Sequence, residues 1–225
     1  MAETRGWDWD RALGEMPGRW TETAGELRLF ADLAAREGAR RVYDIGCGAG
    51  RHTAYLAMRG FEVTASDVSP SALEHTRRIL ADAGLSARLL RSDIRRSPLV
   101  AATFDAVVAF NVVYHATRPE VEAVLDAVAS LLTAGGLLLI TFKSTLDDDC
   151  GRGRQLAPMT WAPVSGIEAG IAHYYADEAE VRRLMAPFEI VSLVLKQEFP
   201  PVPGTDRWRA HWVVVARAGR APGQG

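Results

Sequence analysis

Three glycines at alternate positions, Gly46, Gly48 and Gly50, separate a short apolar segment from a helical pattern. Because glycine lacks a Cβ atom, such a loop can approach a ligand closely, and the free N–H groups that begin the next helix favour a carboxylate or a phosphate. A dinucleotide fingerprint, G-x-G-x-x-G, requires a glycine where this chain has Arg51. The loop therefore predicts a cofactor site, and its spacing argues against a nicotinamide dinucleotide.

Acidic residues follow two further apolar segments of the chain. Asp67 ends the second segment, where a carboxylate can accept hydrogen bonds from both hydroxyls of a ribose. Asp93 ends the third and is placed to accept from an adenine amino group, with Ile94 as an apolar wall. Any one of these acids alone is more typical of a helix cap or a turn. Together with Asp44 they put three acids at three successive strand ends, which indicates a single nucleoside site.

Alternating strand and helix patterns position these residues and predict a mainly parallel sheet. Strands are expected at residues 41–45, 61–66, 87–91, 104–110 and 136–142, and helices at 51–59, 71–83 and 120–132. Residues 143–176 have no clear period and are expected to form a functional loop. A short helix at 177–185 and two long strands at 188–199 and 211–218 follow, and the two strands suggest an antiparallel edge.

With these motifs the chain resembles the class I S-adenosylmethionine-dependent methyltransferases. The resemblance covers about residues 25–218 and lies in VYDIGCGAGR (42–51), VTASDVS (63–69), FDAVVAFNVVYH (104–115) and LLTAGGLLLITF (131–142). GRHTAYLA (50–57) and GFEVTASD (60–67) are similar to the small-molecule branch that includes tellurite-resistance and thiopurine methyltransferase-like proteins. The resemblance implies a Rossmann-like three-layer α/β sandwich, whose seven-stranded, mostly parallel sheet has one antiparallel strand near the C-terminus.

The resemblance also implies how the chain binds S-adenosylmethionine. One domain, residues 1–225, would carry an N-terminal cap (1–30), a lid (143–176) and a flexible tail (219–225). Asp44 would hold the cofactor's ammonium directly or through water, Asp67 its ribose and Asp93 its adenine. Arg51 either reaches the cofactor carboxylate or lies on the helix surface. The remaining expected contacts come from the loop, from the strand ends and from one aromatic residue of the cap: Gly46, Cys47, Gly48, Gly50, Val68, Ile94, Phe110, Asn111 and Trp20.

Methyl transfer from a sulfonium is an in-line displacement, so the protein mainly has to align the acceptor, the methyl group and the sulfur. A general base is useful for a hydroxyl or a protonated amine and unnecessary for a soft thiol or metalloid. The candidates are His115, after the fourth strand, and His173, in the late loop. The alternative interpretation of His115 is a histidine that caps the next helix.

Composition limits the partners. The net charge of −2 and the sequence pI near 6.2 give no general attraction to nucleic acid, and residues 111–114 lack both prolines of the Asn-Pro-Pro-Tyr adenine-N6 motif. No signal or membrane segment is evident, so a cytoplasmic protein with a small-molecule acceptor is expected. Cys47 and Cys150 predict reduced thiols and no metal site. A nucleic-acid or tRNA methyltransferase, a nicotinamide-dependent oxidoreductase and a non-catalytic S-adenosylmethionine-binding protein remain as alternatives. The sequence does not indicate the oligomeric state.

Overall fold

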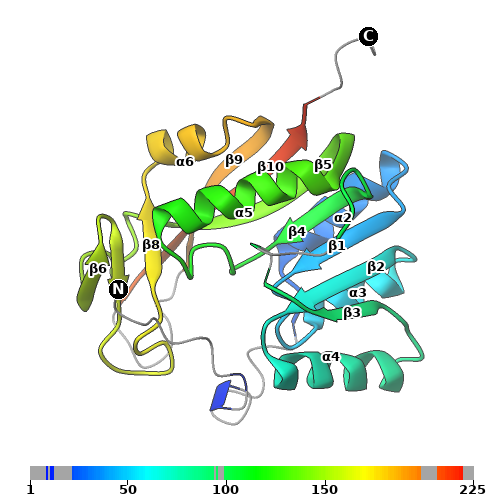
Figure 1. Ribbon diagram of the computed structural model, residues 1–225, viewed down its shortest axis with the longest axis horizontal. Helices are drawn as coiled ribbons and strands as arrows, with labels where there is room; N and C mark the ends of the chain where they lie inside the picture. Colours follow the sequence, from blue (N-terminus) through cyan, green and yellow to red (C-terminus); the bar gives the residue numbers. More distant parts are fainter. Residues whose placement is uncertain are drawn as a thin grey trace.

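A twisted sheet forms the middle layer of the molecule, and helices cover both of its faces (Figure 1). The computed structural model describes residues 9, 11–12, 22–93, 95, 99–198 and 207–219. Trp20, Ile94 and residues 220–225 of the expected tail lie outside these described residues. The strands are β1 (Arg41–Ile45), β2 (Glu62–Asp67), β3 (Arg88–Arg91), β4 (Phe104–Ala109), β5 (Leu132–Ser144), β6 (Arg154–Ala157), β7 (Thr160–Ala162), β8 (His173–Ala176), β9 (Phe188–Glu198) and β10 (Arg209–Ala218).

Seven of these strands form the main sheet, in the order β3-β2-β1-β4-β5-β10-β9. The first five are parallel to their neighbours, and β10 lies antiparallel between β5 and β9. This confirms the expected mostly parallel sheet with one reversed strand near the C-terminus. The count differs, because the described sheet has ten strands. The extra three, β6, β7 and β8, lie within residues 143–176, where a loop without regular structure was expected.

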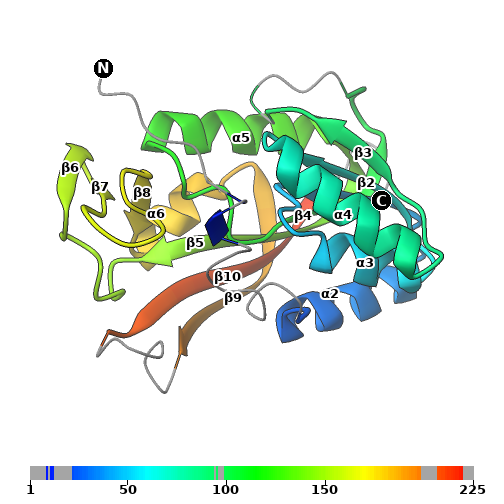
Figure 2. The same cartoon turned by 90° about the horizontal axis from the view of Figure 1, so that it is seen from below.

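The helices form two layers on opposite faces of the sheet, as the turned view shows for α5 and α2 (Figure 2). The helices are α2 (Gly25–Arg36), α3 (Arg51–Met58), α4 (Pro70–Asp82), α5 (Arg118–Leu131) and α6 (Glu178–Leu184). Apolar side chains of α5 and α6 pack with Leu138, Ile140 and Phe142 of β5, and those of α2 and α3 pack with Leu137 and Leu139. The central strand is therefore buried on both faces, as its continuous apolar run predicts.

Local sequence signals fix where the crossover helices begin. Ser69 caps α4 by accepting a hydrogen bond from Ala72 N–H, and proline follows it at the first turn. Thr117 and Glu120 form a capping box at the start of α5. Because β1 to β5 are parallel, their carboxyl ends meet at one edge of the sheet, and the predicted site residues follow those ends. Among the described residues, no helix is long and apolar enough to cross a bilayer.

Candidate functional site

A cavity of about 420 Å³ lies at the carboxyl ends of the parallel strands. It is lined by most of the residues that the sequence assigned to the site: Gly46, Cys47, Gly48, Arg51, Asp67, Val68, Asp93, Phe110, Asn111 and His115. Asp44, Gly50 and His173 are described but are not among its lining residues. Most of the residues predicted to bind the cofactor thus line one cavity, and their roles remain predictions.

The glycine loop between β1 and α3 needs its glycines for two separate reasons. Gly48 and Gly50 have φ angles of 54° and 84°, in the left-handed region that favours glycine. A Cβ atom on Gly48 would also lie 2.3 Å from Cζ2 of Trp9, and one on Gly50 would lie 2.6 Å from Oγ1 of Thr76. The loop is thus held between an indole on its cavity side and α4 behind it.

Asp67 joins this loop to the end of β2. One carboxylate oxygen accepts a 2.9 Å hydrogen bond from Gly48 N–H and the other a 2.9 Å hydrogen bond from Ser69 N–H. Burial raises the pKa of the carboxyl, and the hydrogen bonds from backbone N–H groups oppose that rise. Val68 N–H also acts on this carboxylate, and the two oxygens together retain acceptor capacity for a donor from a ligand in the cavity.

Asp44 lies behind the loop rather than on the cavity wall. Its carboxylate is buried and accepts a 2.6 Å hydrogen bond from Oγ1 of Thr53 on α3. Burial raises the pKa of Asp44 to about 7, and the charge of Asp67 adds to the rise. Burial, with these two acids nearby, also raises the pKa of the Cys47 thiol, so Cys47 stays protonated and is a poor nucleophile.

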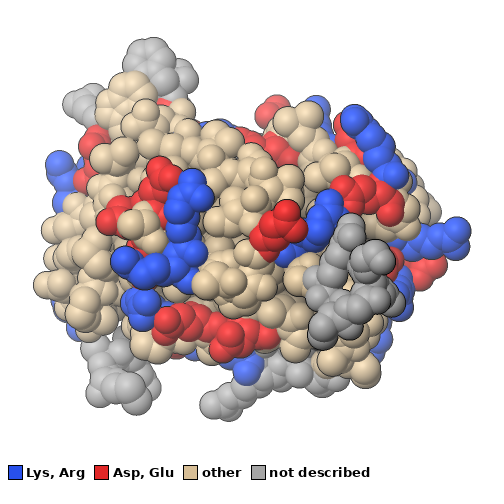
Figure 3. All heavy atoms as spheres, turned by 90° about the horizontal axis from the view of Figure 1, so that it is seen from above, with Lys and Arg blue, Asp and Glu red and all other residues tan. Residues whose placement is uncertain are grey.

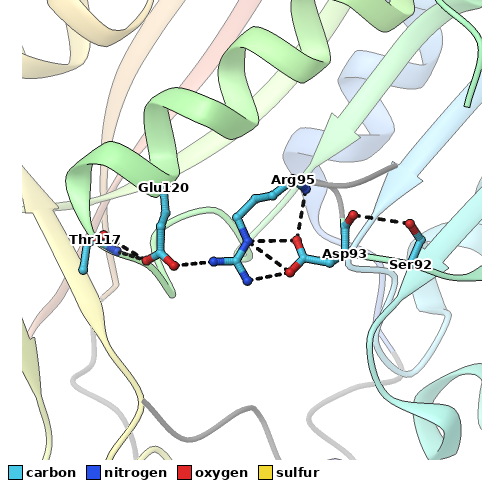
Figure 4. Close-up of polar contacts among 5 residues, drawn as sticks. All are labelled: Ser92, Asp93, Arg95, Thr117 and Glu120. Atoms are coloured by element: carbon cyan, nitrogen blue, oxygen red, sulfur yellow. Dashed lines mark hydrogen bonds and ion pairs between the residues drawn. The ribbon is translucent and has the colours of Figure 1, made fainter. Parts of the chain in front are cut away.

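Asp93 is engaged by a neighbouring cation (Figure 4). Arg95 donates from Nε to both carboxylate oxygens at 2.9 and 3.0 Å, and its backbone N–H donates to Oδ1 at 3.0 Å. The same guanidinium reaches Glu120 on α5, which is held in turn by the backbone and side chain of Thr117. Arg95 therefore bridges the end of β3 to the start of α5, and it uses most of the acceptor capacity that the sequence assigned to adenine.

Asn111 marks the point where β4 leaves the sheet. Its φ is 56°, which is uncommon outside glycine, and such outliers cluster at functional sites. Oγ1 of Thr141 on β5 accepts from Asn111 N–H at 2.7 Å and donates to Asn111 Oδ1 at 3.2 Å. Phe110 lies edge-on to the buried ring of His52, with centroids 5.1 Å apart. These contacts hold both predicted residues on the cavity wall.

His115 and His173 lie together at the other end of the cavity, with ring centroids 4.8 Å apart. Burial lowers the pKa of His115 to about 4, so its imidazole is neutral at physiological pH. Burial also lowers the pKa of His173, whose Nε2 is 3.6 Å from a carboxylate oxygen of Glu168. Glu168 lines the cavity, which connects the buried His173 to it indirectly.

Several residues of this second end were not among the predicted site residues: Tyr114, Lys143, Glu168, Arg209 and His211 line the cavity as well. Trp9 lines it at the loop end. The register of the sheet brings two of them together, since His211 of β10 pairs with Lys143 of β5. The antiparallel edge was predicted, but sequence alone does not specify which residues of β10 lie opposite β5. That register was the signal needed to find this part of the site.

Comparisons with known proteins agree with the geometry. A family model described as "Methyltransferase domain" matches residues 42–136. A ubiquinone biosynthesis O-methyltransferase of Methylocella silvestris is 37% identical over 150 residues, which are 67% of this chain and 54% of that protein. The chain thus spans about half the length of this relative. An uncharacterized methyltransferase of Mycobacterium tuberculosis is 30% identical over 168 residues, 66% of this chain and 83% of that protein.

A solved structure has the same fold at lower identity. The Burkholderia thailandensis 1,6-didemethyltoxoflavin-N1-methyltransferase, determined with 1,6-didemethyltoxoflavin and S-adenosylhomocysteine, superposes with a TM-score of 0.66 at 22% identity. The match covers 94% of this chain and 86% of that one.

Proposed function

Because the chain belongs to the class I S-adenosylmethionine-dependent methyltransferases, we propose that it transfers the methyl group of S-adenosylmethionine to a small-molecule acceptor. The observation that carries this proposal is the single cavity with two chemically different ends. One end has the glycine loop and the ribose-type carboxylate of Asp67, and the other has the imidazole of His115. The O-methyltransferase relative and the toxoflavin-type structural neighbour support a small acceptor.

The residues at the loop end fit the cofactor. The buried carboxylate of Asp67 lines the cavity and is held by backbone N–H groups, and its remaining acceptor capacity suits the hydroxyls of a ribose. Gly46 and Gly48 line the cavity, and their missing Cβ atoms leave room for Val112 and Trp9 to pack against the loop. Arg51 lines the same cavity and would offer a cation to a carboxylate. Adenine is expected on the side of Asp93 and Arg95, and its amino group needs either a shift of Arg95 or another acceptor.

Alignment is the main catalytic contribution expected from this chain. S-adenosylmethionine supplies an electrophilic methyl group on a sulfonium that leaves as a neutral thioether. Asn111 and Phe110, fixed by Thr141 and His52, shape the wall between the two ends of the cavity. His115 is neutral at physiological pH and can accept a proton from an acceptor that must lose one.

Charge on the molecular surface gives no support to a nucleic-acid substrate. On the face shown in Figure 3, basic and acidic side chains are interspersed. Arg77 and Arg78 of α4 both pair with Glu74, and Arg95 pairs with Asp93 and Glu120. Each of these three arginines therefore has an acidic partner, which reduces the positive charge that it offers to a phosphate backbone.

A thermal-shift series tests the cofactor. A ligand that binds only the folded state raises the melting temperature, so we expect S-adenosylmethionine and S-adenosylhomocysteine to raise it and NAD and NADP to leave it unchanged. A rise with a dinucleotide alone would contradict the proposal. Formation of S-adenosylhomocysteine is then measured with a panel of small phenols, acids, amines and thiols, and with tRNA and ribosomal RNA. Turnover on RNA alone would replace the small-molecule acceptor with the nucleic-acid alternative.

A further inference from the structure

The second end of the cavity contains a buried ammonium group. The Lys143 side chain is 2% exposed at the end of β5, and its Nζ lies 5.9 Å from the ring centroid of Tyr114 and 5.3 Å from that of Tyr175. No described group accepts a hydrogen bond from Nζ. A buried ammonium without acceptors is costly, and two aromatic faces compensate for only part of that cost.

The neighbouring carboxylate does not complete the coordination of Lys143. Oδ2 of Asp147 is 3.5 Å from Nζ, so the two groups balance charge without a good hydrogen bond. Asp147 is held in place by the backbone, because Asp149 N–H donates to it at 2.9 Å and Ala210 N–H at 3.1 Å. It is therefore not free to turn toward the ammonium.

Arg209 adds a second buried donor on the same strand face. Its Nη1 is 2.7 Å from a carboxylate oxygen of Asp149, whereas Nε is buried and has no hydrogen-bond partner among the described residues. Arg209 and His211 are two residues apart on β10, so their side chains share one face, and Lys143 lies opposite His211. Lys143, Arg209 and His211 all line the cavity.

Two of the unsatisfied groups at this end are donors on cations, Nζ of Lys143 and Nε of Arg209; the ring nitrogens of the neutral His173 also accept or donate no hydrogen bond among the described residues. Asp147 and Asp149 are bound as described above, whereas Glu168 lies 3.6 Å from His173 and 3.9 Å from Arg209, which is beyond hydrogen-bond distance. A ligand that complements these two cations brings acceptor oxygens, and a carboxylate does so with the opposite charge. Glu168 lies on the same wall, and its carboxylate would disfavour a ligand that carries more than one negative charge.

We propose that the methyl acceptor is a small organic acid and that Lys143 and Arg209 bind its carboxylate as the anchoring group. This inference rests on the proposed function for the location of the methyl donor, but the anion site itself rests on the donors of the cavity. The carboxylate would give Nζ the hydrogen bonds that Asp147 does not supply. The rest of the acid would extend past Tyr114 and His115 toward the loop end.

Calorimetry with matched acids and amides tests the site. Benzoate and 4-hydroxybenzoate are each compared with the corresponding amide in the presence of saturating S-adenosylhomocysteine, using the full chain, Lys143→Met and Lys196→Met. Lys196 pairs with Glu26 at 2.7 Å and does not line this cavity, so it is the matched control for loss of a lysine. We expect the acids to bind at least about 10-fold more tightly than the amides in the unaltered chain and in the control, and this preference to disappear in Lys143→Met.

Three outcomes would overturn the proposal: equal affinity for acid and amide, a preference that survives Lys143→Met, or no binding of either acid. Affinity for S-adenosylhomocysteine should be the same in all three proteins, which separates loss of the anion site from misfolding. If Lys143→Met does not fold, Lys143→Gln takes its place, and the comparison in the unaltered chain stands without any variant. Failure of S-adenosylhomocysteine to bind the unaltered chain would instead contradict the proposed function. Titrations of the acids and amides in the absence of S-adenosylhomocysteine would then still decide whether the anion site exists.

Discussion

Replacing Asp44 with asparagine tests whether burial keeps this carboxyl protonated near neutral pH. The side chain is buried behind the glycine loop, and burial raises its pKa from the ordinary value of 3.8 to about 7. The folded chain then binds the proton more tightly than the unfolded chain does. The stability that results is fully present below about pH 3.8 and is lost as the pH rises through about 7. Asparagine is neutral throughout and still offers an acceptor to Thr53 Oγ1.

The expected magnitude follows from the difference between the two pKa values. At about 1.36 kcal/mol for each pKa unit, 3.8 against about 7 corresponds to roughly 4 kcal/mol between the fully protonated and fully ionised limits. Between pH 5 and pH 8 the linkage relation gives about 2 to 3 kcal/mol of that total. The Asp44→Asn variant should therefore gain about 2 to 3 kcal/mol over the unaltered chain across this range.

Urea unfolding of the two proteins, followed by circular dichroism at several pH values from 5 to 8, measures this difference. The contributions of titrating groups that do not interact with Asp44 cancel when the two free energies of unfolding are subtracted at each pH. The absolute offset between the proteins is not part of the prediction, because asparagine packs differently. A difference that stays constant with pH would show that Asp44 is already ionised in the folded chain, and it would refute the burial argument.

Three further substitutions probe the cavity. Asp67→Asn should weaken S-adenosylhomocysteine binding by about 1.5 to 3 kcal/mol, because a charge-assisted acceptor is lost; unchanged affinity in calorimetry would remove Asp67 from the ribose site. His115→Gln should lower turnover by about 10²- to 10⁴-fold without changing the affinity for S-adenosylhomocysteine. Because burial lowers the pKa of His115 to about 4, titration of this group should cause no loss of turnover in the unaltered chain between pH 6 and 8. Gly48→Ala places a Cβ atom 2.3 Å from Trp9 at a φ of 54°. We therefore expect the free energy of unfolding in urea to fall by about 1 to 2 kcal/mol. An unchanged free energy would mean that the loop relaxes freely.

Regular patterns made most of the fold predictable from the sequence. Strand β1 was predicted at its observed bounds, and helix and strand ends elsewhere lie mostly within one or two residues, because alternating patterns and proline-containing caps mark them. Helix α2 was not predicted as a separate element. The short strands β6 to β8 were missed because three or four residues are too few to show a period, and β8 pairs with β5 only at Lys143 and Ser144.

The site divides in the same way. Each predicted residue of the loop end lies at or just after the end of a strand that the sequence pattern marks. Gly48, Asp67 and Asn111 could therefore be predicted, and all three line one cavity. Lys143 and Arg209 were not predicted, since it is the register of β10 against β5, with His211 opposite Lys143, that brings this part of β10 to the cavity. The assignment of Asp93 to adenine did not anticipate Arg95, because an ion pair two residues away in a turn leaves no sequence signature.

The indole of Trp9 lies against Gly48 on the wall of the cavity and is half-buried there. Indole emission moves to longer wavelength as water gains access to the ring, so a ligand that displaces or covers this ring changes the colour of the light it emits. The other described tryptophans are Trp161 of β7, Trp208, and Trp212 of β10, and a Trp9→Phe variant separates the emission of Trp9 from that of the other tryptophans. The chain therefore contains an intrinsic fluorescent reporter of its glycine loop, which can be read in stopped-flow mixing without any attached dye.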